Sequence, residues 1–167
     1  MSAQAIAGVS PSSEAVVMIE YPSISAGGIG QLLGSIYEAI PLPFGLPKLS
    51  YVFALATAPL GVALYGLQKA FGQRYVLTNR EVQIWTARTQ VKVSSLPLEK
   101  VSEVEVEQHP GQVFFNAADL RFKGDGGETL LKLTGVKDAA AFRNAIERTV
   151  EARKAVSESL ARIEARG

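Results

Sequence analysis

The pattern of hydrophobic and polar positions changes near Gly72. Before it lies an uncharged run from Leu49 to Gln68, bounded by Lys48 and Lys69. A helix of about 20 apolar residues spans the hydrocarbon core of a bilayer. The run therefore predicts a transmembrane helix over about residues 49–69, and a buried helix in a soluble core is the alternative.

A second helix is predicted over about residues 25–40. Its apolar residues recur at helical spacing and form one stripe: Ile29, Leu32, Leu33, Ile36, Tyr37 and Ile40. Small residues on both helices form a predicted helix-packing face, because they let backbones approach closely: Ala26, Gly30, Gly34, Ala54, Ala58 and Gly66. Three placements fit the first helix: re-entrant or spanning and packed on the second, flat on the bilayer surface, or water-soluble and covering the C-terminal domain.

Beyond Gly72 the pattern becomes alternating, as in strands with one buried face. Strands are predicted over residues 74–78, 81–88, 90–94, 102–108, 119–123 and from Thr129, with a brief one at 113–115. The short segment 15–19 either adds a strand or lies on a membrane surface. Asp138 then suits the N-cap of a closing helix. Its last part, from Glu151, is charged and either pairs with a partner helix or frays.

Charge and composition narrow the picture. The net charge is +1 and there is no cysteine, so neither a nucleic-acid surface nor a thiol or disulfide chemistry is indicated. Basic residues are in excess after the run at 49–69, which predicts a cytoplasmic C-terminal domain at the inner membrane. The predicted organisation is a tail (1–20), a membrane region (21–72), a folded domain (73–150) and a charged helical extension (151–167).

Catalytic chemistry finds little support in the sequence. His109 is the single histidine, and no nucleophile elbow, phosphate-binding loop or metalloprotease motif is present. The carboxylates of Glu103, Glu105 and Glu107 share one strand face, and we expect them to meet Arg121 and Lys123 on a neighbouring strand rather than a metal ion. We therefore predict no enzyme activity, cofactor or metal.

Four sequence segments resemble the bacterial pleckstrin-homology (PH)-like family, in its membrane-attached branch. They are the aromatic-Pro-Ser at 21–23, RYVLTNR at 74–80, LPLEKVSEV at 96–104, and GVKD at 135–138 followed by Phe142 and Ile146. The resemblance implies an α+β fold. A membrane helix or helical hairpin would precede a bent antiparallel sheet of about seven strands, closed by one C-terminal helix.

The resemblance also implies a function and partners. We expect a membrane-tethered interaction or scaffold module that contacts lipids, a protein partner or a second copy. The alternative is an accessory or assembly subunit of a larger membrane complex, for example a photosynthetic one. Eukaryotic PH domains bind lipids through basic residues near the first hairpin, so the candidate anionic-lipid contacts here are Arg74, Arg80, Arg88 and Lys92. Trp85, Phe114 and Phe115 are further candidates for a contact surface.

Overall fold

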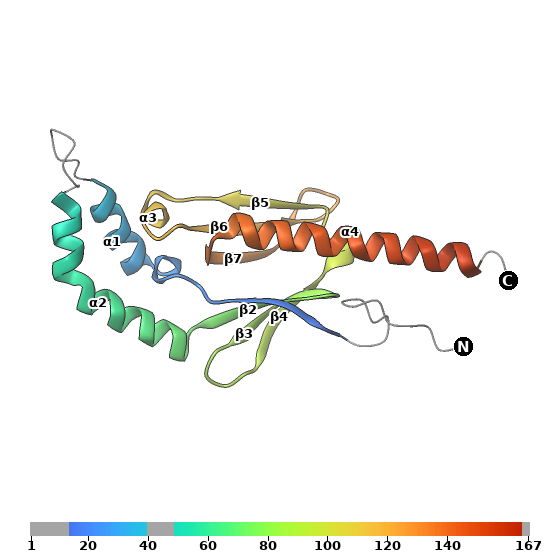
Figure 1. Cartoon of the computed structure of the whole chain (residues 1–167), viewed down its shortest axis with the longest axis horizontal. Helices are drawn as coiled ribbons and strands as arrows, with labels where there is room; N and C mark the ends of the chain where they lie inside the picture. The colour runs from blue at the N-terminus through green and yellow to red at the C-terminus, as the bar shows by residue number, and fades with distance from the viewer. Residues whose placement is uncertain (1–13, 40–48, 165–167) are drawn as a thin grey trace.

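The computed structural model describes residues 14–39 and 49–164, and in this part of the chain seven strands form two antiparallel sheets (Figure 1). The first sheet has the order β1 (Val16–Glu20), β2 (Gln73–Thr78), β3 (Glu81–Thr86) and β4 (Lys92–Pro97). The second has the order β5 (Glu103–Glu107), β6 (Ala117–Lys123) and β7 (Thr129–Lys137). The helices are α1 (Gly28–Ala39), α2 (Leu49–Phe71), α3 (Pro110–Val113) and α4 (Ala139–Glu164), with 3-10 turns η1 (Ile24–Ala26) and η3 (Leu98–Lys100).

Two details of the predicted sheet were wrong. The strands divide four and three between two sheets instead of forming one bent sheet. In addition, no strand forms at 113–115. Pro110 instead opens α3, where the Gln112 side chain accepts a hydrogen bond from the His109 N–H at 2.9 Å, and proline at the first helical position favours such a turn. The seventh strand is β1, from the segment that the sequence left open.

The core lies between the two sheets and under α4. The alternating positions of the strands fill it, among them Leu77, Val82, Leu120 and Leu133. Phe142 and Ile146 on α4 are fully buried against these strands, so the predicted closing helix is confirmed. Tyr75 on β2 ties the sheets together, because its hydroxyl donates to the backbone oxygen of Thr134 on β7 at 2.9 Å.

Helices α1 and α2 are inserted between β1 and β2, two strands that pair directly with each other. They lie side by side at one end of the sheets (Figure 1). The Tyr37 hydroxyl is 2.5 Å from Thr57 Oγ1 and its ring meets Phe53 edge-on. The Gln68 amide donates to the Ser23 backbone oxygen at 2.9 Å, which fastens α2 to the link between β1 and η1.

The helix expected at residues 49–69 forms, but the predicted membrane span does not hold. Among the residues that the structure describes, no helix is long and apolar enough to cross a membrane. Polar and small residues interrupt the apolar run of α2 and lower its mean hydropathy: Thr57, Pro59, Gly61, Gly66 and Gln68. The alternative of a buried helix fails as well, because most described side chains of α2 are exposed.

The ends of the chain complete the comparison with the predicted domains. Helix α4 continues past the sheets as far as Glu164, which agrees with a helical extension (Figure 1). Arg153 pairs with Glu99 and donates to the Asn79 backbone oxygen, so the start of this extension is held against the first sheet and η3. The tail before residue 14 and the proline-rich link at 40–48 lie outside the described residues.

Candidate functional site

The most conspicuous surface of the described chain is apolar and belongs to α1 and α2. Leu55 is 77% exposed and Val62 is 71% exposed. We call the following exposed set the helical apolar surface: Ile29, Leu32, Val52, Phe53, Leu55, Leu60, Val62, Tyr65, Leu67 and Phe71. Many exposed apolar side chains on one pair of helices are typical of a contact site for a protein or a membrane.

Three cations surround the end of α2, each over an aromatic ring. Lys69 Nζ lies 5.6 Å from the centre of the Tyr21 ring. The Arg74 guanidinium is 5.4 Å from Trp85, and that of Arg88 is 5.2 Å from Phe71. We call Lys69, Arg74 and Arg88 the cationic belt. Aromatic and basic residues combined at the edge of an apolar surface are typical of a lipid–water boundary.

The four predicted lipid-contact residues do not share one surface. Arg74 and Arg88 lie in the cationic belt, but Arg80 is in the β2–β3 turn at the opposite end of β2. Lys92 forms an ion pair with Glu81 at 2.9 Å. Burial alone would raise the pKa of Glu81, yet the hydrogen bonds from Lys92 and Gln83 hold it below its usual value.

The described small residues of the predicted helix-packing face do not pack the two helices on each other. A Cβ added to Gly30 would collide with the Ile24 backbone, and one on Gly34 would collide with the carbonyl of Gly111 on α3. These glycines therefore allow α1 to approach η1 and α3, not α2. Ala26 touches Gly135 of β7 in the same way, while a Cβ on Gly66 would meet nothing within 4 Å. Ala58 is exposed, and the side chain of Ala54 lies outside the described part.

The predicted aromatic candidates lie mostly inside the fold. Phe114 and Phe115 are half-buried and pack on Tyr37 of α1, with ring centres 4.7 and 6.2 Å away. Trp85 is also half-buried, and its indole N–H donates to the Gln83 side chain at 2.6 Å. The rings of Tyr37, Phe114 and Phe115 thus join α1 to the segment that follows α3. Of these three residues, Phe115 lines a pocket.

That pocket lies between α2, the β1–η1 link and the end of β7. Its volume is about 410 Å³, and it is lined by Glu20, Tyr21, Pro22, Ser23, Ile24, Tyr65, Phe115 and Lys137. We call it the Glu20–Lys137 pocket. Burial raises the pKa of the Glu20 carboxyl, and Asp138 adds to this, whereas Lys137 acts in the opposite direction. No local sequence pattern indicates this pocket, because residues 20–24, 65, 115 and 137 come together only in the folded chain.

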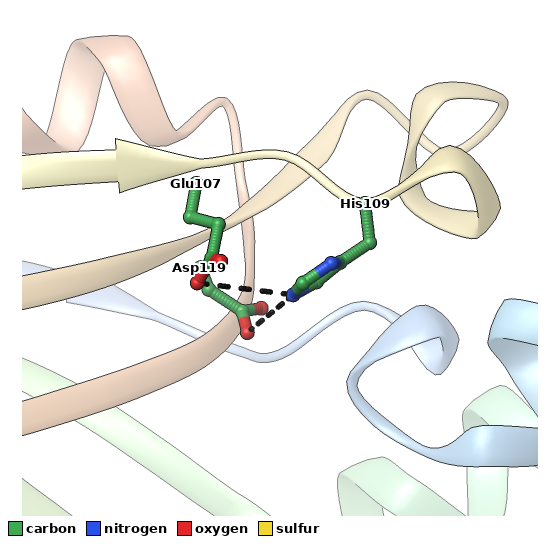
Figure 2. A group of neighbouring side chains, drawn as sticks. All are labelled: Glu107, His109 and Asp119. Carbon is green, nitrogen blue, oxygen red and sulfur yellow. Dashed lines mark ion pairs between the residues drawn. The ribbon is translucent and has the colours of Figure 1, made fainter.

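A second group of polar side chains lies in the other sheet, where β5 ends and β6 begins, next to α3. Glu107 on β5, His109 after it and Asp119 on β6 point toward one another (Figure 2). His109 Nε2 is 3.6 Å from Asp119 and 3.9 Å from Glu107. An imidazole and two carboxylates are donors that a divalent metal can accept.

The charges of this group are already balanced by the protein. Lys132 Nζ lies 2.8 Å from Asp119, and Arg121 pairs with Glu107. The Asp119 side chain is only 3% exposed, and it also accepts hydrogen bonds from Gln112 and from the Gly135 N–H. Burial would raise the pKa of Asp119, but these bonds together hold it below its usual value. A metal would have to displace both cations, so we assign the group a structural role.

Comparison with known proteins adds the family. No curated protein and no solved structure matches the chain significantly. The family model described as bacterial PH domain matches residues 26–150, which is more than half of the chain and includes α1, α2 and the strands from β2 to β7. The two antiparallel sheets, the closing helix and this match agree, and the chain belongs to the bacterial PH domain family.

Proposed function

We propose that this protein is an interaction module that binds a lipid surface through α1 and α2. The family supports an interaction module. The observation that carries the lipid part is the helical apolar surface, bordered by the cationic belt. Apolar side chains would enter the boundary of the acyl chains while the cations meet anionic headgroups.

Charge complementarity favours lipid over a protein partner as the occupant. Helix α2 holds no acidic residue, and its one charged residue, Lys69, lies in its last turn. The neighbouring cations Arg74 and Arg88 follow on β2 and after β3. Apolar residues along the helix and cations at one end match the layering of a bilayer surface, in which acyl chains lie beneath charged headgroups.

Charge reversal in the belt tests the proposal. Each cation near an anionic leaflet contributes about 1 kcal/mol, so Arg74→Glu with Arg88→Glu should weaken binding at least about 30-fold. Co-sedimentation of the full chain with vesicles containing phosphatidylglycerol measures this. Arg80→Glu makes the same change in net charge as either belt substitution alone and should leave binding unchanged, because Arg80 lies at the other end of β2. Equal loss in both variants, or no loss in the double variant, contradicts the proposal.

A further inference from the structure

The Glu20–Lys137 pocket carries charges of both signs on its walls. Glu20 supplies a carboxylate and Lys137 an ammonium group. A purely anionic ligand would face Glu20, and a purely cationic one would face Lys137. A ligand that has a cation and an anion a few bonds apart satisfies both.

The remaining walls suit the cationic end of such a ligand. Tyr65 and Phe115 contribute aromatic rings, Tyr21 contributes a ring that already has Lys69 Nζ 5.6 Å from its centre, and Pro22 and Ile24 contribute apolar surface. Aromatic rings next to a carboxylate attract amines and quaternary ammonium groups through the negative face of the ring. The volume of about 410 Å³ falls within the range of small-molecule sites, roughly 300–1,000 Å³.

Hydrogen bonds from backbone and side-chain groups hold the pocket in shape. The Ser23 N–H donates to the Gly135 carbonyl at 2.7 Å, and the Ser23 carbonyl accepts from Gln68 of α2 at 2.9 Å. Pro22 forms a bridge with Val136 on β7. The β1–η1 link is therefore fixed to both β7 and α2, so a ligand would find the walls already in place.

An apolar stripe leads away from the pocket along α2. Tyr65 lines the pocket, and Val62, Ala58 and Leu55 follow it at helical spacings of three, four and three residues. Residues at these spacings share one side of a helix. All four are exposed, so the stripe offers the tail of a ligand an apolar surface that begins at the pocket.

We propose that the Glu20–Lys137 pocket binds the headgroup of a zwitterionic phospholipid. The amine lies against Glu20 and the aromatic rings, the phosphate against Lys137, and the acyl chains along Tyr65, Val62 and Leu55. The proposal rests on the lipid-binding function above and narrows it to one lipid class.

Short-chain lipids below their micelle concentration test the pocket on the full chain. Dihexanoyl-phosphatidylcholine should bind, and titration calorimetry should show at least tenfold weaker binding for Glu20→Gln and for Lys137→Gln. The matched controls Glu128→Gln and Lys100→Gln remove the same charges at exposed sites outside the pocket and should leave the affinity unchanged. Tyr65→Leu, at an exposed helix position that does not endanger folding, should also weaken binding.

Three results would overturn the proposal or part of it. Unchanged binding in the Glu20 and Lys137 variants overturns the site. Phosphocholine without acyl chains binding as tightly as the lipid overturns the assignment to a lipid. Tighter binding of dihexanoyl-phosphatidylglycerol overturns the zwitterionic class. Loss of vesicle binding in the belt variant with intact binding of the short-chain lipid would support the pocket, so the two proposals can fail separately.

Discussion

At the scale of single residues, Asp119 shows how a polar side chain organises part of the fold. The sequence predicted that Arg121 and Lys123 pair with the glutamates of the neighbouring strand, and this is confirmed by Arg121–Glu107 and by Lys123–Glu105 at 3.0 Å. The role of Asp119 was not predictable, because its partners Gln112, Lys132 and Gly135 come from α3 and β7.

Replacing Asp119 by Asn should lower the free energy of unfolding by about 2 kcal/mol at pH 7, because Lys132 then loses its buried partner. The folded-state pKa of Asp119 lies below its unfolded value, so this stabilisation is present above about pH 4 and is lost as the pH falls through the folded-state pKa. Urea unfolding at pH 7 and at pH 3 measures the effect. The difference between wild type and Asp119→Asn should shrink at pH 3, and Asp125→Asn in an exposed turn should show no difference at either pH.

At the scale of elements, a pattern of small residues predicted a close approach but not the neighbour. The line Ala26, Gly30 and Gly34 does allow backbones to meet, yet the neighbours are η1, β7 and α3. Small-residue spacing identifies a flat helix face and says nothing about which element covers it. The prediction paired this line with the small residues of the 49–69 helix, and it expected no helix at residues 110–113, so the packing of α3 on α1 was not anticipated.

Alanine substitution should change the stability of the fold in opposite directions at a packed helical glycine, Gly34, and at an unpacked one, Gly66. Gly34→Ala should destabilise the fold by about 1–3 kcal/mol, since the new methyl group collides with the Gly111 carbonyl. Gly66→Ala should stabilise it by about 0.5–1 kcal/mol, because nothing lies within 4 Å and alanine favours helix. Chemical denaturation of both variants measures the difference. A similar effect of the two substitutions would contradict the described packing of α1 on α3.

At the scale of the whole molecule, periodicity predicted the order of elements better than their assembly. Alternating strands and a closing helix were predictable because each burial pattern is local. The division into two sheets depends on which distant strands pair, including β1, and no local pattern contains that information. The apolar run at 49–68 was correctly predicted to be a helix. The prediction that this helix spans a membrane was wrong, because none of the described helices is long and apolar enough to do so.

The proposed lipid binding should have two parts that respond differently to salt. The Debye length falls from about 10 Å at 0.1 M to about 3 Å at 1 M, which screens the exposed cationic belt. Binding to phosphatidylglycerol vesicles should therefore weaken with added sodium chloride but retain a salt-resistant part from the apolar surface. Leu55→Asp with Val62→Asp should remove that part, with little effect on folding because both side chains are more than 70% exposed. If binding to the vesicles vanished entirely in high salt, the apolar surface of α1 and α2 would make no contribution, which contradicts the proposal.

The insertion of α1 and α2 between two paired strands has a consequence for protein engineering. Glu20 and Tyr75 are cross-strand partners, so the chain leaves the sheet and returns to it at nearly the same place. A tight turn joining β1 to β2 would close the same gap. A chain shortened in this way would keep the pairing of β1 with β2, but it would lose the contacts of α1 with α3 and of η1 with β7.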